Sequence, residues 1–297
     1  MPTAVGPWIN EPENAILAML TDRQLARKSL QYRRDTLHWI KHAGAGHTGG
    51  SLSCIDILNV LYNRILQVSP DTFSSPTRDR YVQSKGHSVE ALFVVLADQG
   101  FYPASELQTL CRYRSHFVGH PTRKVPGIEQ NTGALGHGLS ICTGMALGAK
   151  KDAADFRVIT LLGDGELAEG SNWEAAMAAA HYRLDNLTAI VDCNTLQITG
   201  RTGDVMNSEP LADKFDAFGW AVRTVDGHDL KALTDALDGV IEAGKPGAII
   251  ARTTKGKGVS FMEDVGKWHH GVPSDDEYTL AMAEIDAALA AIPEESV

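Results

Sequence analysis

The sequence has few cysteines, no excess of basic residues and no long apolar segment. Its 297 residues include four scattered cysteines, Cys54, Cys111, Cys142 and Cys193, with no C-x-x-C pair. This low number and wide spacing of cysteines are typical of a cytoplasmic protein with reduced thiols rather than of a disulfide framework. No uncharged apolar segment approaches the ~18 residues that a membrane span needs. The first residues also lack the basic and apolar parts of a signal peptide. We therefore expect a cytoplasmic protein that does not enter membranes.

Acidic side chains outnumber basic ones. Twenty-seven lysines and arginines stand against 37 aspartates and glutamates, and the net charge is -10. An acidic surface argues against nucleic-acid binding and against adhesion to anionic membranes. The sequence also lacks a G-x-x-x-x-G-K-[ST] motif, which excludes a phosphate-binding P-loop. Hydrophobic residues make up 43% of the chain, which suits a globular protein with a sizeable core.

Short segments rich in valine and isoleucine alternate with helical patterns in the second half of the chain. Strands are predicted at 156–163, 186–194, 220–227 and 247–254, and helices at 12–43, 53–66, 88–99, 136–151, 169–183, 211–218 and 229–244. This alternation is typical of a mostly parallel sheet with helices on both faces. The sequence shows no linker and no repeat, so residues 1–297 are expected to form a single doubly wound α/β domain. The less regular region 44–138 is expected to supply loops to the carboxyl edge of the sheet, where such folds bind ligands.

An acidic, glycine-rich turn follows the strand predicted at 156–163. The segment GDGELAEGSNW brings Asp164, Glu166 and Glu169 close together. Crowded carboxylates repel one another unless a cation or proton chemistry uses them. Asn194 closes the next strand, and a right-handed β-α-β unit places the two strand ends side by side. A carboxylate and an amide oxygen form a site suited to Mg²⁺ or Ca²⁺, to which a diphosphate adds further oxygens.

The same turn fits a second pattern. The letters GDGELA match G-x-G-x-x-A, and Asp192 ends the following strand, where a dinucleotide-binding fold has its ribose-binding acid. However, Asp164 within the turn would repel a pyrophosphate that no cation compensates, and Asn194 would have no role. The sequence therefore favours a metal-bound diphosphate, with Gly163 and Gly165 leaving room for it at the backbone.

Five of the eleven histidines directly follow a glycine. Three of them, His47, His87 and His120, lie in loops rich in small residues. We expect these three to converge on one cleft and to titrate near neutral pH. No H-x-x-x-H or Cys/His spacing typical of zinc sites occurs, so zinc is not expected. A segment rich in lysine and histidine, 255–270, follows the last predicted strand and would bring basic groups to the same edge.

Together these segments resemble the N-terminal half of transketolase. The resemblance runs through GAGHTGGSLSCIDIL, RDRYVQSKGHSVEALFVVLADQG, GHPTRKVPGIEQNTGALGHGLSICTGMALG, LLGDGELAEGSNWEAAMAAAHYRLDNLTAIVDCN and AIIARTTKGKG, which cover nearly the whole chain. It implies the thiamin diphosphate-binding fold, in the form of the domain that holds the diphosphate of the cofactor. It also implies transfer of a two-carbon ketol unit from a ketose to an aldose.

The resemblance assigns residues to the metal and to the diphosphate. It implies that Asp164, Asn194 and the backbone carbonyl of Leu196 bind Mg²⁺, for which Ca²⁺ or Mn²⁺ can substitute. Gly163 and Gly165 are expected to lie against the diphosphate of the cofactor.

Other loops are expected to approach the cofactor as well. By the same resemblance, Gly133 and Leu135 lie near the thiazolium and pyrimidine rings, and Lys255 contacts the diphosphate. One histidine of the pair His269 and His270 is expected to join Lys255, with His270 slightly preferred.

The resemblance also assigns substrate and interface residues. His47, His87, His120 and His270 are expected to contact the substrate during catalysis, and His87 is expected to contact the cofactor too.

Two further glutamates, Glu169 and Glu174, are similar to an acidic pair that links two active sites across a subunit interface. Glu166 takes no role from the resemblance; we group it with the cofactor site and interpret it as a helix N-terminal charge. His137 stands where many members have glutamine, so its role is open.

The family's pyrimidine-binding and C-terminal domains are missing from the sequence. They carry the glutamate that activates the cofactor and the basic residues that bind a sugar phosphate. We therefore expect a natural subunit of a split transketolase, active only with a partner chain in an α2β2 heterotetramer. The substrate is expected to be a sugar phosphate or a related anionic ketose, or alternatively a branched-chain or sulfonated ketose.

Three alternatives to this interpretation stay open. The α subunit of a 2-oxoacid dehydrogenase would share the GDG-to-Asn segment but lack the GHTGG, SKGH and GHP histidines. A 1-deoxyxylulose-5-phosphate synthase would have a much longer chain. The non-enzymatic alternative is a cofactor-binding remnant without catalytic activity.

Overall fold

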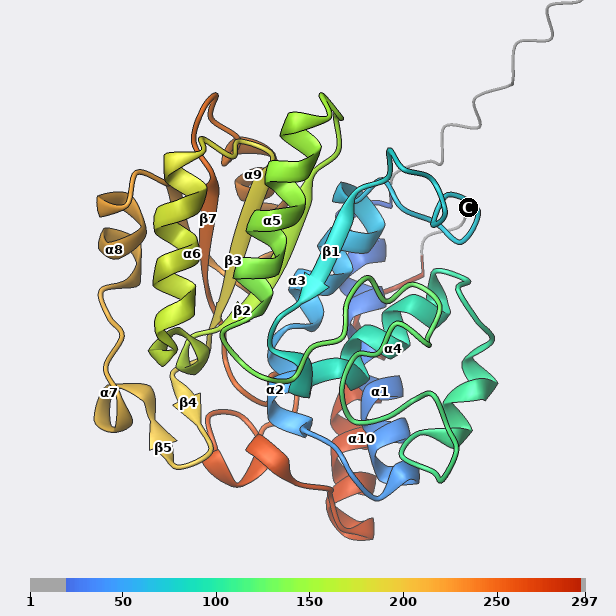
Figure 1. Ribbon diagram of the computed structural model, residues 1–297. Coiled ribbons are helices and arrows are strands. Elements are labelled where there is room, and N and C mark those ends of the chain that lie inside the picture. Colours follow the sequence, from blue (N-terminus) through green and yellow to red (C-terminus); the bar gives the residue numbers. More distant parts are fainter. Residues whose placement is uncertain (1–19, 295–297) are drawn as a thin grey trace, which may run out of the picture.

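The computed structural model describes residues 20–294 and contains a sheet of five parallel strands in the order β1-β2-β3-β7-β6. The strands are β1 (Arg80–Gln83), β2 (Val158–Gly163), β3 (Leu187–Cys193), β6 (Ala221–Asp226) and β7 (Gly247–Arg252). A separate antiparallel ribbon pairs β4 (Leu196–Gln197) with β5 (Gly200–Arg201). Because the five strands are parallel, their carboxyl ends share one edge of the sheet (Figure 1).

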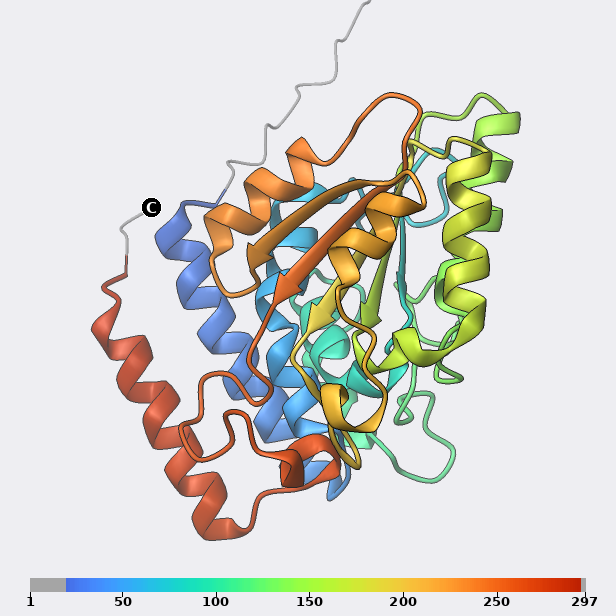
Figure 2. The same ribbon diagram turned by 90° about the vertical axis from the view of Figure 1, so that its left-hand side faces the viewer.

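Helices cover both faces of this sheet, as Figure 1 and Figure 2 show from two directions. One face carries α1 (Asp22–Ala43), α3 (Ile55–Val60), α4 (Val89–Asp98), α9 (Leu230–Gly239) and α10 (Asp275–Ala291). The other face carries α5 (Gly138–Lys151), α6 (Gly170–His181) and α8 (Leu211–Ala217). The short helices α2 (Thr48–Ser53) and α7 (Thr202–Val205) lie near the carboxyl edge.

The sequence of β2 explains why helices are needed on both sides. Ile159 and Leu161 pack into the core beside α1, α3 and α4, whereas Val158 and Leu162 pack into the core beside α5 and α6. Every residue of the strand is buried. A central parallel strand without a solvent face has this pattern of continuous apolar residues. The predicted doubly wound α/β fold is therefore confirmed.

Differences from the predicted elements concentrate in the region 44–138. The edge strand β1 has no counterpart among the predicted strands, because its sequence RYVQ contains no apolar run and its register comes from pairing with β2. The helix predicted over 53–66 is divided among α2, α3 and a π-helix, Leu61–Ile65. The helix predicted over 12–43 is seen from Asp22, and positions 12–19 lie outside the described residues. Within residues 20–294, no helix is long and apolar enough to cross a membrane.

Candidate functional site

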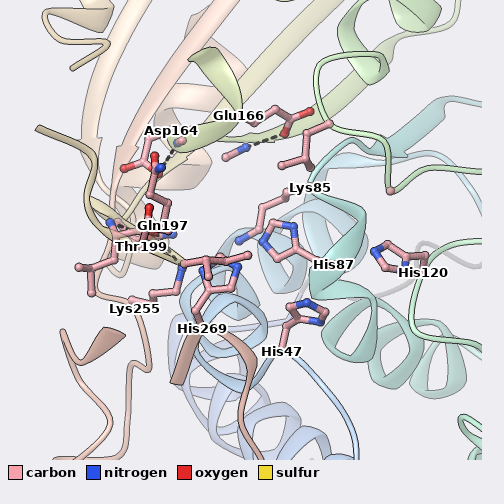
Figure 3. A pocket seen from close by; sticks show the side chains of 17 residues that line it. His47, Lys85, His87, His120, Asp164, Glu166, Gln197, Thr199, Lys255 and His269 are labelled. Carbon is pink, nitrogen blue, oxygen red and sulfur yellow. Dashed lines mark hydrogen bonds between the residues drawn. The ribbon is translucent and has the colours of Figure 1, made fainter. Parts of the chain in front are cut away.

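A cavity of about 480 Å³ lies at the carboxyl edge of the sheet (Figure 3). Residues that follow four different strands form part of its wall: Lys85 after β1, Asp164 after β2, Asn194 after β3 and Lys255 after β7. The other lining residues are His47, His87, His120, Gly133, Leu135, Gly163, Gly165, Glu166, Leu196, Gln197, Ile198, Thr199 and His269. Its volume is in the usual range for small-molecule and cofactor sites.

Asp164 and Asn194 lie at neighbouring strand ends, because β2 and β3 pair directly. The carboxylate of Asp164 accepts hydrogen bonds from the backbone N–H groups of Gly165 (2.8 Å) and Thr195 (2.6 Å). Burial, and then the charge of Asp192, raises the pKa of Asp164 to about 6. A nearby cation would favour the ionised form of this carboxylate and offset the cost of its burial.

Asn194 and Leu196 add two more oxygen atoms beside this carboxylate. The amide oxygen of Asn194 accepts from the backbone N–H of Leu196 at 3.2 Å. The carbonyl oxygen of Leu196 accepts from the ammonium group of Lys255 at 2.9 Å, so a positive charge already lies against it. Carboxylate, amide and carbonyl oxygens are the ligands that Mg²⁺ and Ca²⁺ prefer. Within residues 20–294, no three His, Cys, Asp or Glu side chains are grouped to hold a metal ion. The donor set at this edge therefore suits a hard cation.

Space and positive charge adjoin these oxygen atoms. A Cβ atom on Gly165 would lie 3.2 Å from Oε1 of Gln197, so a side chain there would narrow the gap between the turn and the β4–β5 ribbon. The ammonium of Lys255 is buried, and burial followed by the charge of Lys85 lowers its pKa to about 8. Lys255 is thus still mainly charged at pH 7. An open backbone turn beside an ammonium group suits a diphosphate.

Four histidines from distant parts of the sequence surround the other half of the cavity (Figure 3). The ring centroid of His47 lies 5.3 Å from that of His87, 6.1 Å from that of His120 and 5.9 Å from that of His269. The rings of His87 and His269 are stacked with centroids 5.4 Å apart. The expected convergence of His47, His87 and His120 on one cleft is therefore seen.

The expectation that these histidines titrate near neutral pH is wrong for His47 and His87. Burial, and then neighbouring positive charge, lowers the pKa of His47 to about 4 and that of His269 to about 3. Burial likewise lowers the pKa of His87 and of His120. Charged rings would lose hydration and lie close to one another, so all four are neutral at pH 7. The Nδ1 atoms of His47 and His269 are buried and have no hydrogen-bond partner among the described residues. Both atoms are thus shielded from solvent in this structure, although the two rings line the cavity.

His269, rather than the preferred His270, lines the cavity. The ring of His270 packs edge-on against His47, with centroids 4.6 Å apart. Both residues belong to the 3-10 helix Gly266–His270. Successive side chains in a 3-10 helix point roughly 120° apart, so only one of the two faces the cavity. Counting along the sequence could not decide which one.

Glu166 connects three segments of the chain. Its buried carboxylate accepts from the backbone N–H groups of Gly163 (3.0 Å) and Gly136 (2.9 Å), and from the hydroxyl of Ser84. These donors belong to the end of β2, the loop before α5 and the loop after β1. Glu166 does lie in the first turn of the 3-10 helix Gly165–Ala168, as the interpretation of a helix N-terminal charge expects. Its carboxylate also bonds to Gly136 and Ser84, two long-range contacts that this interpretation did not include.

The remaining predicted residues lie at the rim or outside the cavity. Glu169 and Glu174 are exposed at the start of α6. Their expected role at an interface stays a prediction. His137 is exposed before α5 and borders a smaller hollow together with Asn131 and Ile141.

Sequence reasoning missed several residues of the wall, namely Lys85 and the ribbon segment 197–199. Lysine is usually a surface residue, but Lys85 is buried and forms an ion pair with Asp192. Its place directly before the pair Gly86 and His87, in the SKGH segment, is a signal that the sequence offers. Asp192 is fully buried in bonds to protein groups. It is not free to bind a ribose, which argues against the dinucleotide alternative.

Comparison with known proteins gives consistent matches. Residues 27–289 match the family model described as transketolase, thiamine diphosphate binding domain. The chain is 46% identical over 273 residues to one of the subunits of apulose-4-phosphate transketolase from Phocaeicola vulgatus, covering 92% of this chain and 97% of that protein. It is 41% identical over 256 residues to 6-deoxy-6-sulfo-D-fructose transketolase subunit SqwG of a Clostridium species, covering 86% of this chain and 93% of that protein.

Solved structures agree with these sequence matches. The fold is similar to that of transketolase from Campylobacter jejuni, with a TM-score of 0.78 and 30% identity over 90% of this chain and 48% of that chain. It is also similar to a transketolase variant from Pichia stipitis, with a TM-score of 0.83 and 27% identity over 92% of this chain and 42% of that chain. The chain therefore spans about half the length of these transketolases and nearly the full length of the two relatives named first.

Proposed function

We propose a function from the premise that the chain belongs to the transketolase family and carries its thiamine diphosphate-binding domain. In this proposal, residues 1–297 form the diphosphate-binding subunit of a magnesium-dependent, two-chain transketolase. The observation that carries the proposal is the cavity in which the carboxylate of Asp164, the amide of Asn194 and the carbonyl of Leu196 adjoin a buried lysine and four neutral histidines. Family membership sets aside the 2-oxoacid dehydrogenase alternative.

The residues present fit the cofactor and its metal. Asp164, Asn194 and Leu196 would hold Mg²⁺ through oxygen atoms. Gly165 would leave room for the diphosphate, and the ammonium of Lys255 would balance its charge. When bound, thiamin diphosphate supplies the carbon nucleophile and the electron sink that C–C bond cleavage requires.

The chain's own contribution to the reaction is to orient the sugar by hydrogen bonds. The rings of His47 and His269, which line the cavity, would bond to hydroxyl groups of the ketose. Because the rings are neutral, each can donate from one nitrogen and accept at the other, as hydroxyl groups require. A donor aimed at an oxygen on which charge develops would stabilise the transition state. His87 and His120 extend the same wall.

We propose that a second chain completes the site. Both relatives compared above are named as subunits of transketolases. The chain has only about half the length of the transketolases of solved structure. The exposed glutamates Glu169 and Glu174 would lie at the contact with the partner, in an α2β2 assembly.

The proposed substrate class is an anionic ketose of an unusual kind. The two relatives are named for a ketose phosphate, apulose 4-phosphate, and for a sulfonated ketose, 6-deoxy-6-sulfo-D-fructose. In the cavity of this chain Lys85 is paired with Asp192, and Lys255 is assigned to the diphosphate. Recognition of the distal anion is therefore assigned to the partner chain.

Reconstitution tests the proposed function. The chain alone should show negligible ketol transfer, because the group that activates the cofactor would reside on the partner. Addition of a chain that carries the pyrimidine-binding and C-terminal domains should restore activity. The assay would compare apulose 4-phosphate, 6-deoxy-6-sulfo-D-fructose and xylulose 5-phosphate as donors with one aldose phosphate as acceptor. Rapid turnover by the chain alone, or no turnover of any donor by the pair, would contradict the proposal.

Alanine substitution of the two adjacent histidines should separate their contributions. His269→Ala is expected to lower kcat/KM of the reconstituted pair by about 10²- to 10³-fold, the usual loss for a hydrogen-bond donor to a developing oxyanion. His270→Ala should cause a smaller loss, because that ring packs on His47 rather than lining the cavity. His116→Ala, an exposed histidine outside the cavity wall, is the matched control. A larger loss for His270→Ala than for His269→Ala would overturn this assignment.

A further inference from the structure

A buried ion pair contacts the proposed metal ligand Asn194 and has no role in the mechanism above. The ammonium of Lys85 and the carboxylate of Asp192 are in contact, and their side chains are 1% and 0% exposed. The same ammonium donates to the carbonyl oxygen of Gly50 at 2.9 Å. Both side chains are thus held by the protein core, and Lys85 also lines the cavity.

Both oxygen atoms of Asp192 are already occupied. One oxygen accepts from Lys85, from the hydroxyl of Ser53 at 2.6 Å and from the side-chain NH₂ group of Asn194 at 3.2 Å. The other accepts from the hydroxyl of Thr253. With these bonds in place, Asp192 is a poor candidate for a metal ligand itself. Its carboxylate does, however, contact one proposed metal ligand directly, through the hydrogen bond from Asn194.

This contact fixes which end of the Asn194 amide points where. The two ends of a side-chain amide are nearly equal in shape but opposite in hydrogen-bonding character. Here the NH₂ group meets the carboxylate of Asp192, and the oxygen meets the backbone N–H of Leu196. A flipped amide would set oxygen against carboxylate and N–H against N–H. Two favourable contacts would become two repulsive ones.

We propose that the Lys85–Asp192 ion pair is a positioning device that orients the Asn194 amide so that its oxygen, not its NH₂ group, is presented to the divalent cation. Lys85 balances the buried negative charge that this orientation requires. The inference rests on the proposed function, because it concerns the metal of that site. Partners of this kind, one shell away from a metal, typically change its affinity by about 10- to 100-fold.

Two charge-neutral double variants isolate the hydrogen bond from the charge. Lys85→Met with Asp192→Leu replaces the pair by apolar groups of similar size, a change that buried ion pairs often tolerate. Lys85→Met with Asp192→Asn also removes both charges but keeps an oxygen that can accept from Asn194, while its NH₂ group can turn to Thr253. We expect the leucine variant to bind Mg²⁺ about 10- to 100-fold more weakly than the parent. The asparagine variant should stay within about threefold of the parent.

The measurement is calorimetry of thiamin diphosphate binding to the full chain with its partner, at a series of Mg²⁺ concentrations. Thermal melts followed by circular dichroism would verify that each variant is folded. Equal Mg²⁺ affinity of the two double variants would overturn the inference. Absence of Mg²⁺-dependent binding by the parent complex would instead contradict the proposed function, so the two failures are distinguishable.

Substitution of Asn194 itself supplies a second test. Its expected result would not occur if the Lys85–Asp192 pair had a purely structural role. Asn194→Asp has two equivalent oxygens, so orientation ceases to matter. In the leucine double variant it should restore Mg²⁺ affinity at least tenfold. In the parent it should weaken Mg²⁺ binding, because the new carboxylate faces Asp192. Asn194→Asp adds the same negative charge in both backgrounds. Tighter Mg²⁺ binding in one background and weaker binding in the other therefore shows that Asp192 determines the effect. If the leucine variant does not fold, unchanged or tighter Mg²⁺ binding by the single Asn194→Asp variant would still overturn the inference.

Discussion

Replacing Asp164 by alanine is expected to weaken Mg²⁺-dependent binding of thiamin diphosphate by roughly 100-fold or more, equivalent to about 2.7 kcal/mol. Asp164 is the carboxylate of the proposed ligand set, and its loss removes the negative charge that attracts the cation. Alanine removes the acceptor of the backbone N–H groups of Gly165 and Thr195, but these bonds are only partly buried, so water in the cavity can replace the carboxylate. Burial also disfavours the ionised side chain in the unliganded protein, so the fold should be retained. Calorimetry of the reconstituted complex at fixed Mg²⁺ would measure the effect.

Two controls accompany this variant. Asp155→Ala removes an exposed carboxylate just before β2 and should leave cofactor affinity unchanged. Asp164→Asn keeps the size and one oxygen atom, so its loss should be smaller than that of alanine. Cofactor affinity of Asp164→Ala equal to that of Asp155→Ala would count decisively against the metal assignment.

Replacing Glu166 by alanine is expected to lower the free energy of unfolding by about 2–6 kcal/mol. Its carboxylate accepts from the backbone N–H groups of Gly163 and Gly136, both of which would be left buried without a partner. Each unsatisfied group of this kind costs about 1–3 kcal/mol. Urea denaturation of the isolated chain would measure the change.

The controls for Glu166 separate its bonds from its charge. Glu166→Gln retains one carbonyl oxygen and should be less destabilising than alanine. Glu174→Ala removes an exposed glutamate of α6 and should change the free energy of unfolding by less than about 0.5 kcal/mol, as surface substitutions usually do. A loss below about 1 kcal/mol for Glu166→Ala would show that its backbone contacts do not stabilise the turn.

The two predictions explain how three carboxylates coexist in one short turn. Asp164 lines the cavity, where a cation would compensate its charge. Glu166 is buried among backbone N–H groups, which stabilise its charge without a cation. Glu169 is exposed at the start of α6, where water screens it. Repulsion is thus relieved in a different way for each, although the sequence presents them as one cluster.

The proposed positioning role of Lys85 and Asp192 extends this argument to a buried ion pair beside the cavity. A lysine that follows β1 and an aspartate of β3 are buried together at a ligand-binding edge. Replacing such a pair by apolar residues often leaves stability unchanged, so stability alone does not account for it. The proposed orientation of the Asn194 amide accounts for the buried pair, which its contribution to stability does not.

The sequence by itself determined the layered architecture and the position of the proposed metal ligands. Alternating apolar segments and helical patterns are local properties, and a β-α-β unit necessarily brings Asp164 and Asn194 to adjacent strand ends. The long motifs around His47, His87 and His120 also indicated a shared cleft.

Tertiary structure alone decided the protonation of the histidines, the choice of His269 over His270, the bonds of Glu166 and the Lys85–Asp192 pair. Each depends on burial or on contacts between residues far apart in the chain. A lysine that follows an edge strand looks the same in sequence whether it faces water or a carboxylate. The free energy of a charged group is set by what surrounds it, and the surroundings exist only in the folded chain.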